Sequence, residues 1–232
     1  PTVHIQWNEN TAILSGDQMM IEAYKLLAEV PADKLHKVLR LFNKMATEIC
    51  EGQQYDVDFE SQEHVTIEEY LKMIRLKTSV LLATALQTGS YLAGANEAQQ
   101  EALYQFGINV GLAFQIQDDI LDVWGDPKTF GKAVGGDISC NKKTYVYLTA
   151  QKLADDELAE ELHQWYGSVL DDNTEKIAAV KGIFEQLNVR AACEAVVEDY
   201  TQKALLILDT LPQNAATEQL RQLANKLNTR KD

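Results

Sequence analysis

The most informative stretch of this chain is Phe114-Gln115-Ile116-Gln117-Asp118-Asp119-Ile120-Leu121-Asp122, in which three carboxylates stand within an apolar run. If the stretch is helical, Asp118 and Asp122 lie on one face, with Asp119 beside them. Like charges at this spacing cost a helix roughly 0.2–0.5 kcal/mol per pair unless a cation or solvent answers them. Clustered carboxylate oxygens suit Mg²⁺, which combines one or two carboxylates with waters and substrate phosphates. The spacing alone fits either a magnesium site or a solvated acidic face.

Apolar residues flank these acids and favour the first of the two readings. They include Leu112, Ala113, Phe114, Ile116, Ile120 and Leu121. Side chains of this kind usually form the core of a protein. We therefore expect the three acids to line a cleft rather than an open surface.

The composition is that of a helical protein with a strong negative charge. The 232 residues are 46% hydrophobic, which is enough for one sizeable core or at most two small ones. Only 4 Pro and 12 Gly are present, while Ala, Leu, Glu and Gln are frequent, so helix is favoured. The net charge of −14 argues against nucleic acid as a partner. A small phosphorylated substrate stays compatible, because bound Mg²⁺ and a few lysines can reverse the local field.

Three cysteines and one long apolar stretch bear on the environment of the protein. Cys50, Cys140 and Cys193 are odd in number and lack metal-binding spacing, so we expect a reducing, cytoplasmic setting. The longest apolar stretch, 79–95, contains polar residues and follows Lys77. We interpret this stretch as a buried helix rather than a membrane span.

Helical periodicity covers most of the chain, and no strand pattern is convincing. Thr66-Ile67-Glu68-Glu69 fits a capping box at a helix start. The predicted helices span about 10–29, 31–53, 67–92, 97–123, 144–153, 155–170, 174–187, 189–212 and 215–228. The sequence therefore predicts an all-α protein of roughly nine helices, with residues 1–232 forming a single domain.

The segment from Trp124 to Lys143 interrupts this pattern and is rich in glycine and lysine. An irregular segment of this length is usually functional. Its part Gly131-Lys132-Ala133-Val134-Gly135-Gly136-Asp137 joins a flexible backbone to a cation, although a glycine-rich loop alone is a weak signal. Asp137 either caps the next turn or orients Lys132. Lys142 and Lys143 add further positive charge.

Two polar residues within predicted helices complete the set of candidates. Lys77 stands among apolar neighbours, where it either extends to the surface or answers a buried anion. Gln115 lies three residues before Asp118, so its amide falls on the same helix face. Carboxylates for Mg²⁺, scattered lysines and apolar walls together indicate a site for a diphosphate with an apolar tail.

These residues resemble the trans-isoprenyl diphosphate synthases, the family of the farnesyl and geranylgeranyl diphosphate synthases. The resemblance covers most of the chain and is strongest from Gly52 to Thr144. Asp118–Asp122 is similar to the second aspartate-rich motif of the family, and residues 131–137 match its GKxxGxD loop. The further matches are Lys77-Thr78, Lys142-Lys143-Thr144, Gly52-Gln53-Gln54-Tyr55-Asp56 and Ser15-Gly16-Asp17.

The resemblance implies a helical bundle around a central cavity, of the isoprenoid synthase type. It implies a Mg²⁺-dependent prenyltransferase, with Mn²⁺ as an alternative metal, that condenses an allylic diphosphate with isopentenyl diphosphate. It also implies a cytoplasmic homodimer. The implied roles are metal binding for Asp118, Asp119 and Asp122, diphosphate binding for Lys77, Lys132 and Lys142, catalysis for Lys77, Thr78 and Gln115, and a place in or near the site for His4 and Asp137.

One departure from the family pattern is large. The first aspartate-rich motif and the arginine pair that follows it are not found, and Pro1-Thr2-Val3-His4 resembles the segment after them. We therefore expect the chain to be incomplete at its N-terminal side and inactive by itself. A non-catalytic, synthase-like regulatory subunit is the main alternative. A terpene cyclase is less favoured, because it would not need the GKxxGxD loop together with Lys77-Thr78.

Overall fold

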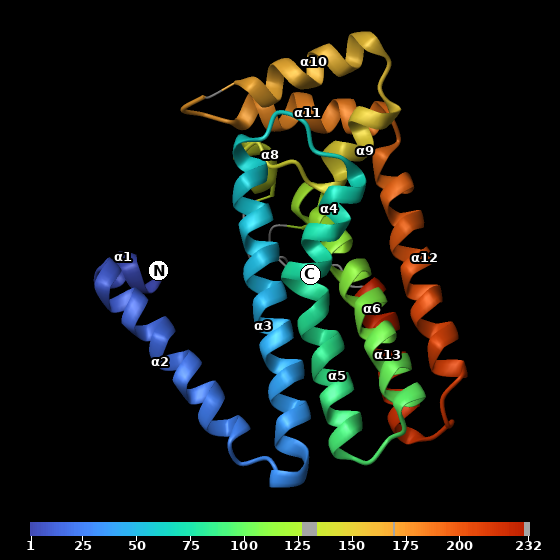
Figure 1. The fold of residues 1–232 in the computed structure, drawn as a ribbon. Helices are drawn as coiled ribbons and strands as arrows, with labels where there is room; N and C mark the ends of the chain where they lie inside the picture. Colours follow the sequence, from blue (N-terminus) through green and yellow to red (C-terminus); the bar gives the residue numbers. More distant parts are fainter. Residues whose placement is uncertain (127–133, 169, 230–232) are drawn as a thin grey trace. The chain divides into compact units, whose positions relative to one another are not determined.

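The computed structural model describes residues 1–126, 134–168 and 170–229, and their regular structure is entirely helical (Figure 1). The prediction of an all-α protein is therefore confirmed. The chain divides into two compact units, residues 1–44 and residues 45–232. The prediction of a single domain stays a prediction. Among the described residues, no helix combines the length and the apolar character that a membrane crossing requires.

The unit 1–44 contains α1 (Val3–Gln6), α2 (Glu9–Leu27) and the first part of α3 (Ala32–Ser61). The side chain of Asn8 caps α2 by accepting a hydrogen bond from the backbone N–H of Thr11. Tyr24 of α2 donates a 2.7 Å hydrogen bond to Asn43 of α3, and its ring contacts Phe42 edge-on. The unit exposes many apolar side chains, among them Ile5, Trp7, Ile13, Leu14, Met19, Met20, Ile21 and Leu26.

The helix predicted to end near Gln53 continues to Ser61 as α3. Residues 54–61 include no glycine or proline that would break the helix, and Phe59 is buried, with only 7% of it exposed. Burial of Phe59 stabilises two further turns that sequence periodicity alone did not predict. These two turns contain Asp56, which belongs to the unit 45–232.

The helix predicted over 67–92 begins as expected but is not continuous. Thr66 and Glu69 form the predicted capping box, with hydrogen bonds of 2.8 Å and 3.1 Å. The chain then forms α4 (Ile67–Ile74), a π-helical turn η1 (Arg75–Ser79) and α5 (Val80–Leu92). Turns of this kind often mark functional sites. Here the π-helical turn contains the Lys77-Thr78 pair.

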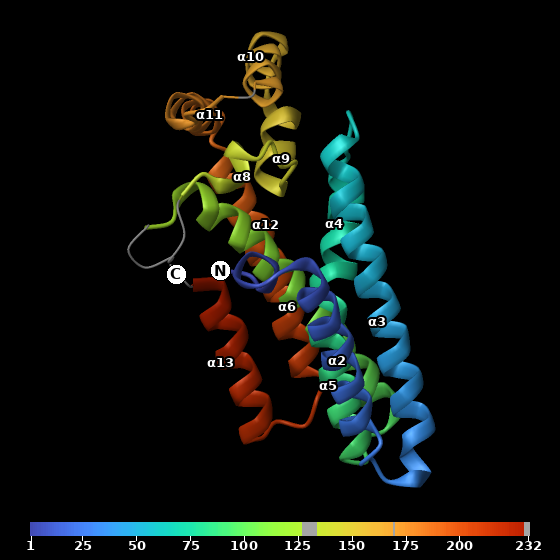
Figure 2. The same cartoon turned by 90° about the vertical axis from the view of Figure 1, so that its left-hand side faces the viewer.

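Helix α6 (Glu97–Trp124) lies between α5 and α12 (Val189–Asp209) and contacts both (Figure 2). At Gly107 and Gly111 the backbones approach closely, since a Cβ atom there would lie 2.5 Å and 2.6 Å from Ala83 and Ser79. Helix α13 (Ala215–Thr229) packs against α6 and α12. The shared core contains Phe106, Val110, Ala204, Leu208, Leu211 and Ala224.

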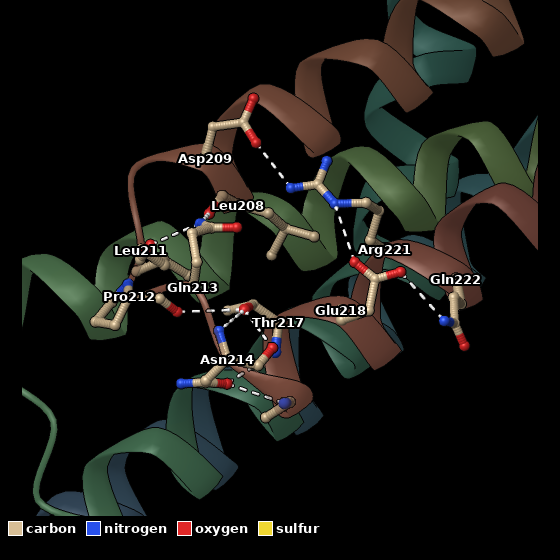
Figure 3. Close-up of polar contacts among 11 residues, drawn as sticks. Leu208, Asp209, Leu211, Pro212, Gln213, Asn214, Thr217, Glu218, Arg221 and Gln222 are labelled. Atoms are coloured by element: carbon tan, nitrogen blue, oxygen red, sulfur yellow. Dashed lines mark hydrogen bonds and ion pairs between the residues drawn. The ribbon is translucent and has the colours of Figure 1, made fainter.

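A polar turn joins α12 to α13 (Figure 3). The backbone N–H of Asn214 donates to the hydroxyl of Thr217 at 2.9 Å, and Gln213 donates to the carbonyls of Leu208 and Leu211. Arg221 of α13 pairs with Asp209 of α12 at 2.7 Å. These contacts connect the C-terminal end of α12 to α13 at one end of their apolar core.

The segment predicted to be irregular, 124–143, contains the short helix α8 (Gly136–Ser139), while residues 127–133 lie outside the described residues. It is followed by α9 (Tyr145–Leu153), α10 (Asp156–Gly167) and α11 (Thr174–Gln186). Helices α10 and α11 contact each other and lie crosswise to α12 (Figure 1). Helix α11 also contacts α8, so it supports that turn from outside.

Candidate functional site

A pocket with a volume of about 170 Å³ lies within the unit 45–232. Residues from α3, α4, η1, α6 and α8 line it, together with the segment that leads into α9. The described lining includes six carboxylates and three lysines. The lining residues are Asp56, Phe59, Glu60, Tyr70, Met73, Ile74, Lys77, Gln115, Asp118, Asp119, Asp122, Asp137, Cys140, Asn141, Lys142, Lys143 and Thr144.

The last two turns of α6 place Asp118, Asp119 and Asp122 at this pocket. Asp119 is only 4% exposed, and its Oδ2 accepts a 2.6 Å hydrogen bond from the Tyr70 hydroxyl. The same oxygen accepts a 3.0 Å bond from the backbone N–H of Tyr145. Burial raises the pKa of Asp119 to about 7, with Asp137 adding to the rise and the Tyr70 hydrogen bond opposing it. Asp119 therefore joins α4, α6 and α9 at the pocket.

Asp122 connects α6 to the turn that begins α8. Its Oδ2 accepts a 3.0 Å hydrogen bond from the N–H of Asp137, and its backbone carbonyl accepts one from Gly135 at 2.7 Å. Gly135 has a φ of 84°, a left-handed conformation that favours glycine. Burial and the nearby Asp137 raise the pKa of Asp122 to about 6. Both shifted carboxylates are groups that a bound cation would stabilise in the charged form.

The π-helical turn directs Lys77 and Thr78 toward two different partners. Lys77 forms a 2.6 Å ion pair with Asp56 of α3. Thr78 donates a 3.2 Å hydrogen bond to the side chain of Gln115 on α6. The turn packs directly on α3, since a Cβ atom at Gly52 would lie 2.3 Å from the backbone nitrogen of Lys77. The close contact that Gly52 allows thus sets the position of Lys77.

Two further lysines enter the pocket after α8. Lys142 pairs with Asp137 at 3.2 Å. Burial alone would lower the pKa of Lys142, but Asp137 outweighs it and the pKa lies above its ordinary value. Lys143 donates a 2.8 Å hydrogen bond to the carbonyl of Phe59, and burial lowers its pKa. The pocket therefore holds cations that are already matched to carboxylate or carbonyl oxygens.

The structure gathers most of the residues that the sequence singled out. Those lining the pocket are Lys77, Gln115, Asp118, Asp119, Asp122, Asp137 and Lys142, and Thr78 is linked to it through Gln115. Lys132 lies outside the described residues. His4 is exposed in α1 of the unit 1–44, and its place near the site stays a prediction.

For two residues of the site, the sequence pattern predicted no role. Asp56 is the ion-pair partner of Lys77. It lies four residues after Gly52, the glycine that contacts η1. Tyr70 precedes Lys77 by seven residues, which places both on one helix face, and this spacing could have indicated it. The bond from Tyr70 to Asp119 spans 49 residues of sequence, and no local pattern predicts such a partner.

The donor chemistry of the pocket fits a hard divalent cation that brings its own additional ligands. Within the described ranges, no three acidic, histidine or cysteine side chains converge into a complete metal site. One carboxylate oxygen of Asp119 and one of Asp122 already accept hydrogen bonds from protein O–H or N–H groups. Mg²⁺ commonly takes only one or two carboxylates and completes its shell with waters and substrate phosphates.

This all-α fold, with an acidic helix end and lysines on one pocket, is that of the isoprenoid synthases, and residues 1–187 match the family model of polyprenyl synthetase. The chain belongs to the polyprenyl synthetase family. It is similar to a short chain isoprenyl diphosphate synthase of Methanocaldococcus jannaschii, with 41% identity over 72% of this chain and 51% of that protein.

Solved structures agree with this membership. A crystal structure of a geranylgeranyl pyrophosphate synthase shares 46% identity and a TM-score of 0.93, covering 100% of this chain and 72% of that one. A geranylgeranyl pyrophosphate synthase of Corynebacterium glutamicum, complexed with isoprenyl diphosphate and magnesium, shares 28% identity and a TM-score of 0.87. In that comparison 97% of this chain and 64% of the other are covered. The match with the Methanocaldococcus relative covers about half the length of that protein.

Proposed function

We propose that this chain supplies the diphosphate-binding and metal-binding part of a trans-prenyltransferase. The reaction condenses an allylic diphosphate with isopentenyl diphosphate. The allylic C–O bond breaks and pyrophosphate leaves with the electron pair. The double bond of isopentenyl diphosphate then attacks the allylic cation, and a proton passes to pyrophosphate. The observation that carries this proposal is the meeting of Asp118, Lys77 and Lys142 at one pocket from α6, from η1 and from the segment before α9.

A divalent cation is needed because the pocket is predominantly acidic. The described lining contains twice as many carboxylates as lysines, six against three, so a diphosphate alone would meet net repulsion. Asp118 would hold Mg²⁺, or Mn²⁺ as the alternative, together with phosphate oxygens and water, while Asp119 and Asp122 fix the helix end that presents it. When bound, the metal supplies charge stabilisation for the departing pyrophosphate. The magnesium complex of the Corynebacterium synthase supports this assignment.

The protein's own side chains bind and orient the substrate. Lys77 and Lys142 exchange part of their contact with Asp56 and Asp137 for phosphate oxygens, which make charge-assisted hydrogen bonds. Thr78 and Gln115 direct oxygen dipoles toward the allylic cation. Helices α3, α4 and α6 exclude water that would quench this cation.

We also infer a cytoplasmic homodimer. The apolar side chains exposed in the unit 1–44, such as Leu14 and Met20, support a partner subunit. The three cysteines are unpaired, which fits a reducing compartment.

Substitution of Asp118 tests the proposed function. Asp118→Asn keeps the shape of the side chain but removes the charge that attracts the metal. Transfer of labelled isopentenyl diphosphate, assayed in the longest form of the protein that its gene encodes, should fall at least 100-fold. Asp171→Asn, in the exposed turn before α11, is the matched control and should stay within twofold of wild type. A loss below tenfold in Asp118→Asn would contradict the metal assignment.

A further inference from the structure

Lys176 of α11 is a fully buried lysine that the proposed chemistry does not use. Its exposed fraction is 0%, and no carboxylate within the described residues lies at ion-pair distance from its ammonium. The ammonium instead donates hydrogen bonds to the side-chain oxygen of Asn141 and, at 3.1 Å, to the carbonyl of Ser168. It also lies 5.9 Å from the centre of the Tyr166 ring.

A buried ammonium without a carboxylate costs stability unless its hydrogen bonds are good ones. An apolar side chain of similar length could fill the same space without that cost. The ammonium of Lys176 therefore contributes by fixing the positions of the two groups that accept its hydrogen bonds, the Asn141 side chain and the Ser168 carbonyl. One of these groups, Asn141, lines the pocket.

Asn141 is placed where a small change would reach the substrate site. It directly precedes Lys142 and has a φ of 55°, a left-handed conformation that reverses the chain after α8. Its backbone N–H donates to the carbonyl of Ile138 at 3.1 Å, and the N–H of Lys142 donates to the carbonyl of Asp137 at 2.9 Å. The turn that positions Lys142 thus includes the residue that Lys176 holds.

The neighbour of Lys176 contacts the other end of the same segment. A Cβ atom at Gly135 would lie 2.8 Å from a methyl carbon of Ile177, so α11 packs tightly at that point. Successive residues of α11 therefore touch both ends of the segment 135–141. Between these ends lies Asp137, which bonds to Asp122 and pairs with Lys142.

We propose that Lys176 is a positioning residue of the diphosphate pocket, which acts through Asn141 to fix Lys142 and Asp137 for phosphate binding. The inference rests on the proposed function in that the phosphate is the group to be bound. Lys176 itself is not among the residues that line the pocket. Its effect is on the geometry of the segment 135–142.

Three single variants separate positioning from simple stability. Lys176→Met removes the ammonium and keeps a long apolar side chain. Asn141→Gly removes the acceptor at a backbone conformation that glycine adopts without strain, so this variant is expected to fold. Lys152→Met, at the exposed C-terminal end of α9, makes the same charge change away from the pocket and is the matched control.

Two measurements on the purified full chain give the result. Amide hydrogen exchange of a peptide over 138–146 should accelerate at least tenfold in Lys176→Met and in Asn141→Gly, while a peptide over 97–113 of α6 stays unchanged. The dissociation constant of inorganic pyrophosphate with Mg²⁺, measured by calorimetry, should rise at least tenfold in both. The double variant should be no weaker than the weaker single one, because both changes remove one contact. Lys152→Met should match wild type in each measurement.

Two results would overturn the proposal. One is unchanged exchange over 138–146 in Asn141→Gly, and the other is uniform acceleration over all peptides of 45–229 in Lys176→Met, which is the signature of general destabilisation. If the wild-type chain binds no pyrophosphate with Mg²⁺, the proposed function fails in this chain. The exchange comparison still decides whether Lys176 holds the segment.

Discussion

At the scale of single residues, glycine determines how closely the helices around the pocket approach. Gly52 of α3 and Gly111 of α6 both face the π-helical turn, and a Cβ atom at either would overlap backbone atoms at 2.3–2.6 Å. Backbone atoms cannot move aside as a flexible side chain can. The positions of Lys77 and Thr78 therefore depend on the absence of a side chain on two neighbouring helices.

Replacement of Gly52 by alanine should show this dependence. In Gly52→Ala we expect a loss of about 2–3 kcal/mol in the free energy of unfolding, because the new methyl group must displace the backbone of η1. Urea unfolding followed by circular dichroism measures this change.

Gly89→Ala in α5 is the matched control for this experiment. No atom lies within 4 Å of the added Cβ at Gly89, so alanine there should stabilise the helix by roughly 0.5–1 kcal/mol. If both variants shifted in the same direction, the argument from close backbone contact would be wrong.

At the scale of elements, helix ends are held by polar groups of unequal burial, as the turn between α12 and α13 illustrates (Figure 3). Thr217 is only 8% exposed, and its hydroxyl accepts from Asn214 and donates to the carbonyl of Pro212 at 3.2 Å. The ion pair between Arg221 and Asp209 is shorter at 2.7 Å, yet the Asp209 side chain is 57% exposed. Burial rather than length should decide which contact matters more.

Two substitutions rank these contacts. Thr217→Val keeps the shape of the side chain but removes its buried hydroxyl, which leaves the N–H of Asn214 and the carbonyl of Pro212 without this partner, so we expect a loss of about 1–2 kcal/mol. Arg221→Met should cost less than about 1 kcal/mol, because the pair it removes is largely solvated. Urea unfolding at low salt gives both values, and a larger cost for Arg221→Met would refute the ranking.

At the scale of the whole molecule, the negative charge sets the conditions under which a diphosphate can bind. The chain carries a net charge of −14, and the acidic lining of the pocket repeats this excess locally. Three lysines in the described lining are not enough to reverse it. Binding of a diphosphate is therefore expected to need divalent cations.

Removal of the metal tests this expectation directly. Pyrophosphate binding, followed by calorimetry, should weaken at least 100-fold when EDTA replaces Mg²⁺ at constant ionic strength. Restoring Mg²⁺ should recover the affinity. Tight binding in EDTA would mean that the lysines alone hold the phosphate.

Local patterns in the chain were sufficient to predict the all-α class, most helix ranges and the acidic end of α6. Periodicity, capping boxes and charge spacing act between residues a few positions apart, and sequence displays them directly. The resemblance to prenyl diphosphate synthases was also readable, because its motifs are short and ordered. The family membership confirmed that interpretation.

Contacts between distant residues decided the rest. The π-helical turn at Lys77 lies where α3 and α6 approach its backbone closely, and the extension of α3 is stabilised by the burial of Phe59. The hydrogen bonds to Asp119 come from residues that lie 49 and 26 positions away in the sequence. The hydrogen bond from Lys176 to Asn141 spans 35 positions. Such partners depend on how the helices pack, and packing is a property of the folded chain that no local pattern contains.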